Sequence, residues 1–184
     1  MREVVVVDYD PNWPLVFEQL RARTWPAVQD VALSIEHVGS TSVPGLAAKP
    51  IIDISIVVPS QDVLPVVIER LTSLGYVHQG ELGVEGREAF KAPPDLPVHN
   101  MYVCPAGSLG LINQIAVRDH LRRHPESAAA YARLKKALAE KFPADIDSYV
   151  EGKTDVVLAI LRAEGLPTDK IAAIEAANRR PAQS

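Results

Sequence analysis

Hydrophobic and polar residues along the first 107 positions follow the periods of both strands and helices. Apolar residues at positions 13, 16, 17, 20, 25 and 28 recur with helical spacing, and Pro26 is expected to bend or end this helix. A second helix is expected from a cap at Ser60 or Asp62 to about residue 74, with Gly75 just beyond its end. Apolar and β-branched runs predict strands at 4–7, 32–38, 50–58, 76–78, 89–91 and 98–104.

From residue 108 onward the pattern is helical. Four helices are expected, at 109–123, 125–142, 146–164 and 168–180, with breaks at His124-Pro125, Pro143 and Gly165-Leu166-Pro167. A run of strands followed by helices predicts an α+β fold, a mixed sheet with helices packed on one side. We expect one domain over 1–165, sheet-rich over 1–107 and helical over 108–165. A C-terminal helix and a frayed tail should follow over 166–184.

Composition narrows the class of protein. The chain has 184 residues, 47% of them hydrophobic, which is enough for one substantial core. Its net charge of -4 argues against general nucleic-acid binding, which needs a basic face. The single cysteine, Cys104, cannot form an internal disulfide and is expected in the core. There is no signal-peptide pattern and no apolar run of about 20 residues, so we expect a cytoplasmic protein outside the membrane.

The stretch 37–58, HVGSTSVPGLAAKPIIDISIVV, carries the candidate chemistry. Gly39-Ser40-Thr41-Ser42 is a small polar loop whose backbone N–H groups and hydroxyls suit a phosphate, and Lys49 can neutralise some of its charge. The following strand places Asp53 and Ser55 on one face. Asp53 lies between isoleucines, so it is expected to serve a ligand, although it can instead cap a loop or pair with Lys49 or an arginine.

This stretch resembles the signature of the GrpB-like family, a branch of the polymerase-beta-type nucleotidyltransferase superfamily. The segments GREAFKA, VHNMYVC and RDHLRRHPESAAAYARLKKALA resemble the same family in the expected order. The resemblance covers most of residues 3–165. It implies a nucleotidyltransferase-like fold and a nucleotide or other phosphorylated ligand.

The resemblance also implies site residues. In the superfamily a Gly-Ser pair holds the nucleotide phosphates, and three carboxylates on two strands hold two metal ions. Gly39 and Ser40 match the pair, and Asp53 matches the first carboxylate. The second carboxylate position is Ser55, a departure that leaves a poor set of ligands for Mg²⁺.

His99 and Asn100 stand where the third carboxylate is expected. His99 is therefore a candidate catalytic residue and, with Asp53, a candidate ligand for a divalent metal, Mg²⁺ or Mn²⁺. An imidazole and an amide suit Mn²⁺ or Zn²⁺ better than Mg²⁺. Alternatively, the two side chains hydrogen-bond a base, a sugar or a phosphate.

Several cations are candidates for contacts with the ligand. Arg87 can bind a phosphate with two parallel hydrogen bonds or form a surface ion pair. Arg118 and Lys135, and with lower weight Lys153, either lean over the cleft or belong to solvated helix faces. His37 either lines the cleft or is structural.

His120 and His124 have the four-residue spacing of a zinc clamp on a helix. The sequence shows no third ligand near them, and histidines also suit a helix C-terminus, so we do not predict a metal there. Glu85 and Glu88 can reach the cleft as acids, but a solvated turn is the favoured interpretation.

Two functions remain open. The first is transfer of a nucleotidyl group to an unknown small acceptor. The second is a catalytically silent nucleotide- or anion-binding module, with Ser55 marking a lost carboxylate. A docking role for the helical half is a third hypothesis. The sequence does not predict the nucleotide, the acceptor or the oligomeric state.

Overall fold

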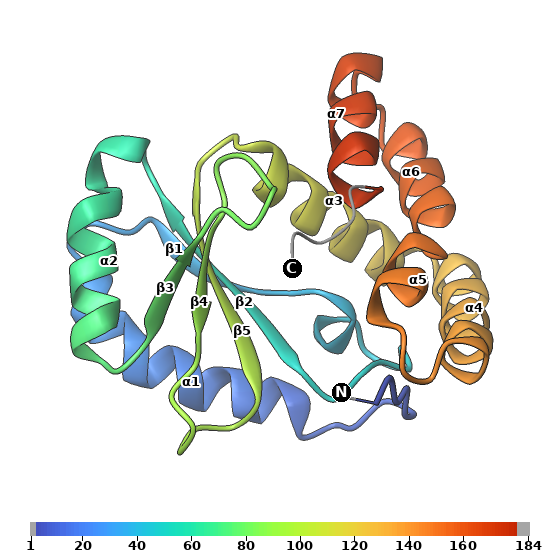
Figure 1. The fold of residues 1–184 in the computed structure, drawn as a ribbon, viewed down its shortest axis with the longest axis horizontal. Coiled ribbons are helices and arrows are strands. Elements are labelled where there is room, and N and C mark those ends of the chain that lie inside the picture. The colour runs from blue at the N-terminus through green and yellow to red at the C-terminus, as the bar shows by residue number, and fades with distance from the viewer. Residues whose placement is uncertain (1–2, 180–184) are drawn as a thin grey trace.

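The computed structural model describes residues 3–179, and the end of the predicted tail lies outside this range. The N-terminal half combines short strands with two helices, and the chain order is seen in the colours of Figure 1. Its elements are α1 (Trp13–Val28), β1 (Ser34–Val38), the 3₁₀ turn η1 (Ser40–Ser42), β2 (Ile52–Val58), the 3₁₀ turn η2 (Gln61–Val63), α2 (Leu64–Ser73), β3 (Val77–Gly80), β4 (Glu88–Lys91) and β5 (His99–Pro105).

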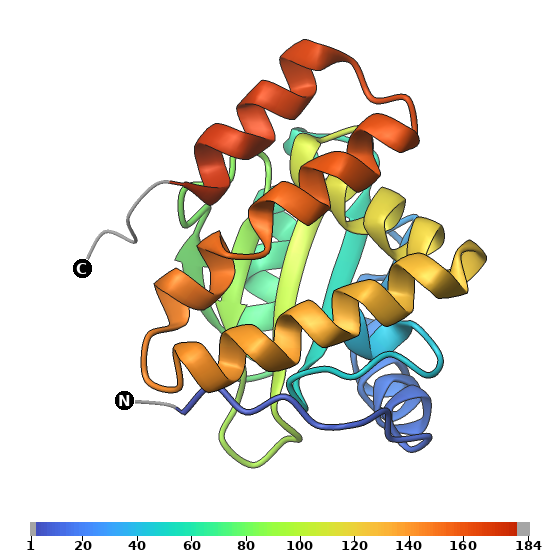
Figure 2. The ribbon, with the colours of Figure 1, turned by 90° about the vertical axis from the view of Figure 1, so that its right-hand side faces the viewer.

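The C-terminal half is helical, as predicted. Its helices are α3 (Leu109–Arg123), α4 (Pro125–Lys141), α5 (Ile146–Glu151), α6 (Thr154–Ala163) and α7 (Thr168–Asn178). In the view of Figure 2 they lie in front of the sheet. Within residues 3–179, no helix is both long enough and apolar enough to cross a membrane.

The five strands form one mixed sheet in the order β1-β2-β5-β4-β3. β2 runs antiparallel to β1 and parallel to β5, and the remaining pairs are antiparallel. The register places Asp53 opposite Val38 on one side and opposite Asn100 on the other. The end of β1, which leads into the Gly-Ser loop, and the start of β5 therefore flank the start of β2.

Side-chain alternation in β2 gives the sheet two covered faces. Ile52, Ile54 and Ile56 point into the main core with the apolar residues of α1 and α2. Val57 on the opposite face packs with Cys104 and Leu111 of α3. The predicted packing of helices on one side only was therefore wrong, because α1 and α2 cover one face of the sheet and α3 packs on the other. The α+β class itself is confirmed.

Three other segments differ from the predicted elements. Residues 4–7 form no strand, and only Val7 pairs, with Ala48, in an isolated bridge. Pro26 lies inside α1 without ending it. The expected helix 146–164 is divided at Gly152, where an added Cβ would lie 2.5 Å from Leu138 Cδ2. This division orients the next residue, Lys153, differently from a continuous helix.

Gly75 ends α2 as expected. Its φ is +92°, a left-handed conformation that glycine adopts without a Cβ clash. The N–H of Gly75 donates to Thr72 O and that of Tyr76 donates to Leu71 O, which is the pair of bonds of a Schellman motif. Sequence chemistry therefore defines this helix end.

Candidate functional site

The Gly-Ser loop between β1 and β2 has a conformation that requires glycine. Gly39 has φ +69° and ψ -174°, a region essentially restricted to glycine. The Ser42 hydroxyl donates to Gly39 O at 2.6 Å, and the Thr41 hydroxyl is 3.0 Å from His37 Nε2. The hydroxyls of Thr41 and Ser42 thus hold the loop together, which leaves Ser40 as the hydroxyl with no such internal bond.

His37 supports the loop from beneath. Its ring stacks on Phe17, with 4.7 Å between ring centroids, and is buried. Burial, together with the charges of Arg122 and Arg118, lowers its pKa to about 4. His37 is therefore neutral at physiological pH and structural, the second of its two interpretations.

Two arginines of α3 hold the loop backbone. Arg122 donates from Nε and Nη2 to Ser42 O at 3.0 and 2.7 Å. Arg118 donates from Nη1 to His37 O at 3.1 Å and to Glu36 Oε2 at 2.9 Å, and from Nε to Asp119 Oδ1. Arg118 is thus held by contacts with the chain, and it also lines a hollow of about 200 Å³ next to the loop.

Asp53 lies directly against this loop. A Cβ added to Gly39 would be 2.2 Å from Asp53 Oδ2, so the missing side chain makes room for the carboxylate. Asn100 Nδ2 donates to Asp53 Oδ1 at 2.7 Å. Burial raises the pKa of Asp53, while the Asn100 hydrogen bond and the charges of Lys49, Lys153 and Arg87 oppose this rise.

Ser55 and His99 do not lie beside Asp53 as further ligands for a metal ion. Ser55 is fully buried, and its hydroxyl donates to Gln114 Oε1 of α3 at 2.6 Å. His99 pairs with Ile52 in the register and points to the opposite face, where Nε2 lies 2.9 Å from the Tyr76 hydroxyl and Nδ1 lies 2.6 Å from Pro97 O. The expectation that His99 lies beside Asp53 was wrong, because side chains alternate along β5.

A hollow of about 190 Å³ opens beside Asp53. Three lysines reach it, Lys49 before β2, Lys135 on α4 and Lys153 between α5 and α6. Its lining residues are Ser40, Thr41, Ala48, Lys49, Ile51, Asp53, Asn100, Lys135, Tyr149 and Lys153. The buried Tyr149 ring lies between two of the cations, 4.6 Å from Lys153 Nζ and 5.4 Å from Lys49 Nζ.

Burial and mutual repulsion disfavour the charged forms of two of these lysines, Lys135 and Lys153. Lys135 is only 1% exposed and donates to Ala47 O. Burial and then the charge of Lys153 lower the pKa of Lys135 to about 7, although Asp53 opposes this. Burial and then Lys49 lower the pKa of Lys153 to about 8. Among the described residues, Asp53 is the acidic side chain that lines the hollow with these lysines, and an added anion would favour the charged forms of Lys135 and Lys153.

The residues around Asp53 do not fit the pair of divalent ions that the family resemblance implies. Of the residues that the structure describes, Asp53 is the one acidic side chain lining the hollow, and one of its oxygens already accepts from Asn100. Ser55, at the second carboxylate position, is hydrogen-bonded to Gln114. Divalent metal sites for phosphoryl chemistry need several anionic oxygens. Here the described residues offer the Asp53 carboxylate alone, and lysines line the hollow beside it.

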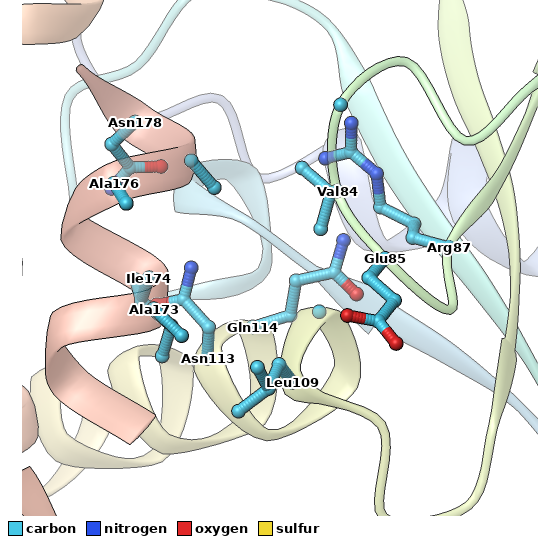
Figure 3. Close-up of a pocket in the computed structure, with 13 residues that line it drawn as sticks. Val84, Glu85, Arg87, Leu109, Asn113, Gln114, Ala173, Ile174, Ala176 and Asn178 are labelled. Carbon is cyan, nitrogen blue, oxygen red and sulfur yellow. The ribbon is translucent and has the colours of Figure 1, made fainter. Parts of the chain in front are cut away.

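Two further hollows continue from the first. The second hollow, of about 200 Å³, is lined by Ser40 and Lys153, which also line the first. A third hollow, of about 220 Å³, has Asn113, Gln114 and Asn178 in common with the second. The third hollow lies between α3, α7 and the loop before β4 (Figure 3). Figure 3 shows Arg87 on that loop. Its guanidinium lies 4.7 Å from the Tyr102 ring centroid, and its Nε is buried without a hydrogen-bond partner.

The remaining candidates are distributed around this cleft. Glu85 lines the pocket of Figure 3, whereas Glu88 pairs with His78 at 2.5 Å. Gln114 and Tyr149 were not singled out from the sequence, because an amide and a ring in helices have no distinctive pattern. Lys153 carried a weak signal, a lysine after a helix-interrupting glycine.

The fold defines the class of protein. Terminal uridylyl transferase 4 from Trypanosoma brucei, a structure with bound CTP, matches with a TM-score of 0.50 and 16% identity, over 92% of this chain and 57% of that chain. At this identity the likeness concerns the fold alone, which is nucleotidyltransferase-like. A family model described as GrpB protein matches residues 3–163, and the chain belongs to the GrpB family.

Individual relatives agree with this assignment. The crystal structure of GrpB from Enterococcus faecalis is 31% identical, with a TM-score of 0.77 over 87% of this chain and 99% of that chain. The glutamate-rich protein GrpB of Alkalihalophilus pseudofirmus is 34% identical over 86% of this chain and 94% of its own length. The match spans 45% of Bacillus subtilis YqkA and 66% of Pseudomonas aeruginosa PA4798, so some relatives are longer. The predicted family is confirmed.

The contact between Gly39 and Asp53 predicts a specific effect of Gly39→Ala. The new Cβ would overlap the carboxylate, and we expect a loss of about 2–4 kcal/mol in the free energy of unfolding, combining strain and overlap. Gly45→Ala is the matched control, since Gly45 has φ +79° with nothing within 4 Å of an added Cβ. It should lose only about 1–2 kcal/mol. Urea unfolding measures both, and equal losses would contradict the close approach.

Proposed function

We propose that this protein binds the phosphate chain of a nucleotide, or of another small phosphorylated molecule, in the hollow beside Asp53. The observation that carries the proposal is that Lys135 and Lys153, whose charged forms burial disfavours, line one hollow together with Lys49, Ser40 and Asp53. Ammonium groups held close together repel one another, and an anion placed between them relieves that repulsion. The Ser40 hydroxyl supplies a further donor at the same wall.

The neighbouring hollows support a ligand longer than a phosphate chain. Ser40 and Lys153 line both the first hollow and the second, so a ligand can extend from one into the other. Amide side chains of Asn113 and Gln114 then provide donors and acceptors for a base or sugar. The Oδ1 atom of Asn113 is buried and has no hydrogen-bond partner within residues 3–179, which favours a polar ligand group there. Arg87 lines the hollow of about 220 Å³, which shares no lining residue with the one beside Asp53.

Nucleotidyl transfer to a small acceptor is a second candidate, favoured by the fold and by the position of Asp53. In this reaction an acceptor hydroxyl oxygen bonds to the α-phosphorus, pyrophosphate leaves, and the hydroxyl proton passes to the Asp53 carboxylate. Burial raises the pKa of Asp53, which makes it a better base. The lysines would stabilise the leaving pyrophosphate. No divalent metal takes part in this scheme.

Calorimetry on Asp53→Asn separates anion binding from metal-dependent binding. With ATP, CTP, GTP, UTP or tripolyphosphate in EDTA, we expect the variant to bind about fivefold more tightly, because a nearby negative charge worth about 1 kcal/mol is removed. The Asn side chain retains an oxygen for Asn100. Binding that needs Mg²⁺ and disappears in Asp53→Asn would contradict the proposal, as would no binding of any of these anions.

A lysine pair tests the cationic wall. Lys153→Met should weaken the binding of the same anions by about tenfold or more, since a charge-assisted contact is worth about 1.5–3 kcal/mol. Lys136→Met is the matched control, because Lys136 pairs with the exposed Asp8 at 2.6 Å outside the hollow. It should change the dissociation constant by less than about twofold. Equal effects of the two substitutions would contradict the proposal, because anion binding would then depend on the net charge of the protein and not on a lysine of the hollow.

The pH dependence of binding follows from the lowered lysine pKa values. Lys135 and Lys153, with pKa values of about 7 and about 8, are both charged below pH 7 and lose protons as the pH rises. The phosphate is fully ionised above a pKa of about 6, so tripolyphosphate affinity should fall by about tenfold or more from pH 7 to pH 9. An affinity that is constant or rises over this range would contradict the lysine assignment.

A further inference from the structure

Three metal-ligating side chains meet where α3, α4 and α6 come together. His120 and His124 belong to the last turn of α3 and its C-cap, four residues apart. Glu164 is the C-cap of α6, brought to them by tertiary packing. None of the three lines the hollows described above. This cluster is therefore separate from the candidate anion site.

The geometry brings the ligand atoms to one point. His120 Nδ1 lies 2.7 Å from Glu164 Oε1, and the centroids of the two imidazole rings are 4.4 Å apart. One ligand atom from each of the three residues lies within 4.8 Å of the others. Among the described residues, this is the one group of three or more His, Cys, Asp and Glu with such an arrangement.

The surroundings resemble the supporting contacts of a metal site. His120 Nε2 lies 3.3 Å from the Ser127 hydroxyl, which can accept a hydrogen bond from the Nε2–H group. The unprotonated Nδ1 is then the metal ligand. Arg123 donates to Oε2 at 2.6 Å and leaves Oε1 facing the histidines.

We propose that His120, His124 and Glu164 form a zinc site, with water as the fourth ligand. Two imidazoles and a carboxylate are an established ligand set for Zn²⁺, with bonds of about 2.0–2.2 Å and ligand atoms about 3.3 Å apart. The present separations need changes of about 1–1.5 Å, which the side chain of the partly exposed His124 can supply. The ion would fasten the α3–α4 corner to the end of α6.

Calorimetric titration of the metal-free full chain with ZnSO₄ tests the site. We expect one ion per chain with a dissociation constant in the micromolar range or below. Saturating Zn²⁺ should also raise the melting temperature by about 3 °C or more, because the ion binds the folded state. MgCl₂ should produce neither effect, since Mg²⁺ prefers oxygen ligands. The absence of stoichiometric Zn²⁺ binding would overturn the proposal.

Substitutions locate the ion. His124→Gln and Glu164→Gln should each weaken Zn²⁺ binding by about tenfold or more. Arg123→Gln should strengthen it, because a cation that competes for Glu164 is removed. His78→Gln is the matched control, since His78 also pairs with a glutamate, Glu88, but belongs to no three-ligand group among the described residues. It should leave the affinity unchanged.

Two results would overturn the assignment even if zinc binds. One is an unchanged affinity in His124→Gln, a half-exposed position where the substitution is tolerated by the fold. The other is weaker binding in Arg123→Gln, which would mean that Glu164 serves only as an ion-pair partner. Asp53→Asn should leave Zn²⁺ binding unchanged, so this proposal and the proposed anion site fail or succeed independently.

Discussion

An imbalance of charge around Asp53 is the constraint on which the site depends. Among the described residues, three lysine side chains and one carboxylate line this hollow, where Lys135 is buried and the other three are partly buried. The fold maintains this arrangement because each lysine comes from a different part of the chain and is held by its own packing. Lys135 bonds to a carbonyl, and Lys153 lies over the Tyr149 ring. An arrangement that disfavours its own charged state is typical of a site for an ionic ligand.

The same carboxylate also links the two halves of the molecule. Asp53 contacts the Gly39 backbone, and the arginines of α3 hold the loop that contains this glycine. Ser55, next on the same face of β2, bonds to Gln114 of α3. The residue at the second carboxylate position therefore has a structural partner. A serine engaged in this contact agrees with the proposal that phosphate is bound by lysines and not through metal ions.

Much of the fold could be predicted from local patterns. The period-2 strand at β2, the helix at α3 and the glycine end of α2 follow from the sequence directly. The errors arose where tertiary contacts decide. Residues 4–7 are β-branched, yet of these four Val7 alone forms a β-bridge. Gly152 lies against Leu138, and this close packing of α5 on α4 is invisible to helical periodicity.

The candidate site was predictable to the extent that one short stretch contains it. Gly39, Ser40, Lys49 and Asp53 are close in sequence, and the structure brings Asn100 and Lys135 to them. His99 was placed on the wrong face, since its neighbour Asn100 is the residue in register with Asp53. Glu164 could not be assigned to His120, because 44 residues separate them and only the packing of α6 on α3 joins them.

The central claim concerns lysines whose charge is destabilised until an anion binds. Heteronuclear NMR of lysine side chains, with Lys135 and Lys153 assigned by substitution, measures this most directly. The account predicts pKa values of about 7 and about 8 without ligand, and higher values for both when tripolyphosphate saturates the protein. Ordinary lysine pKa values of about 10.4 in the ligand-free protein, or values that tripolyphosphate leaves unchanged, would contradict it.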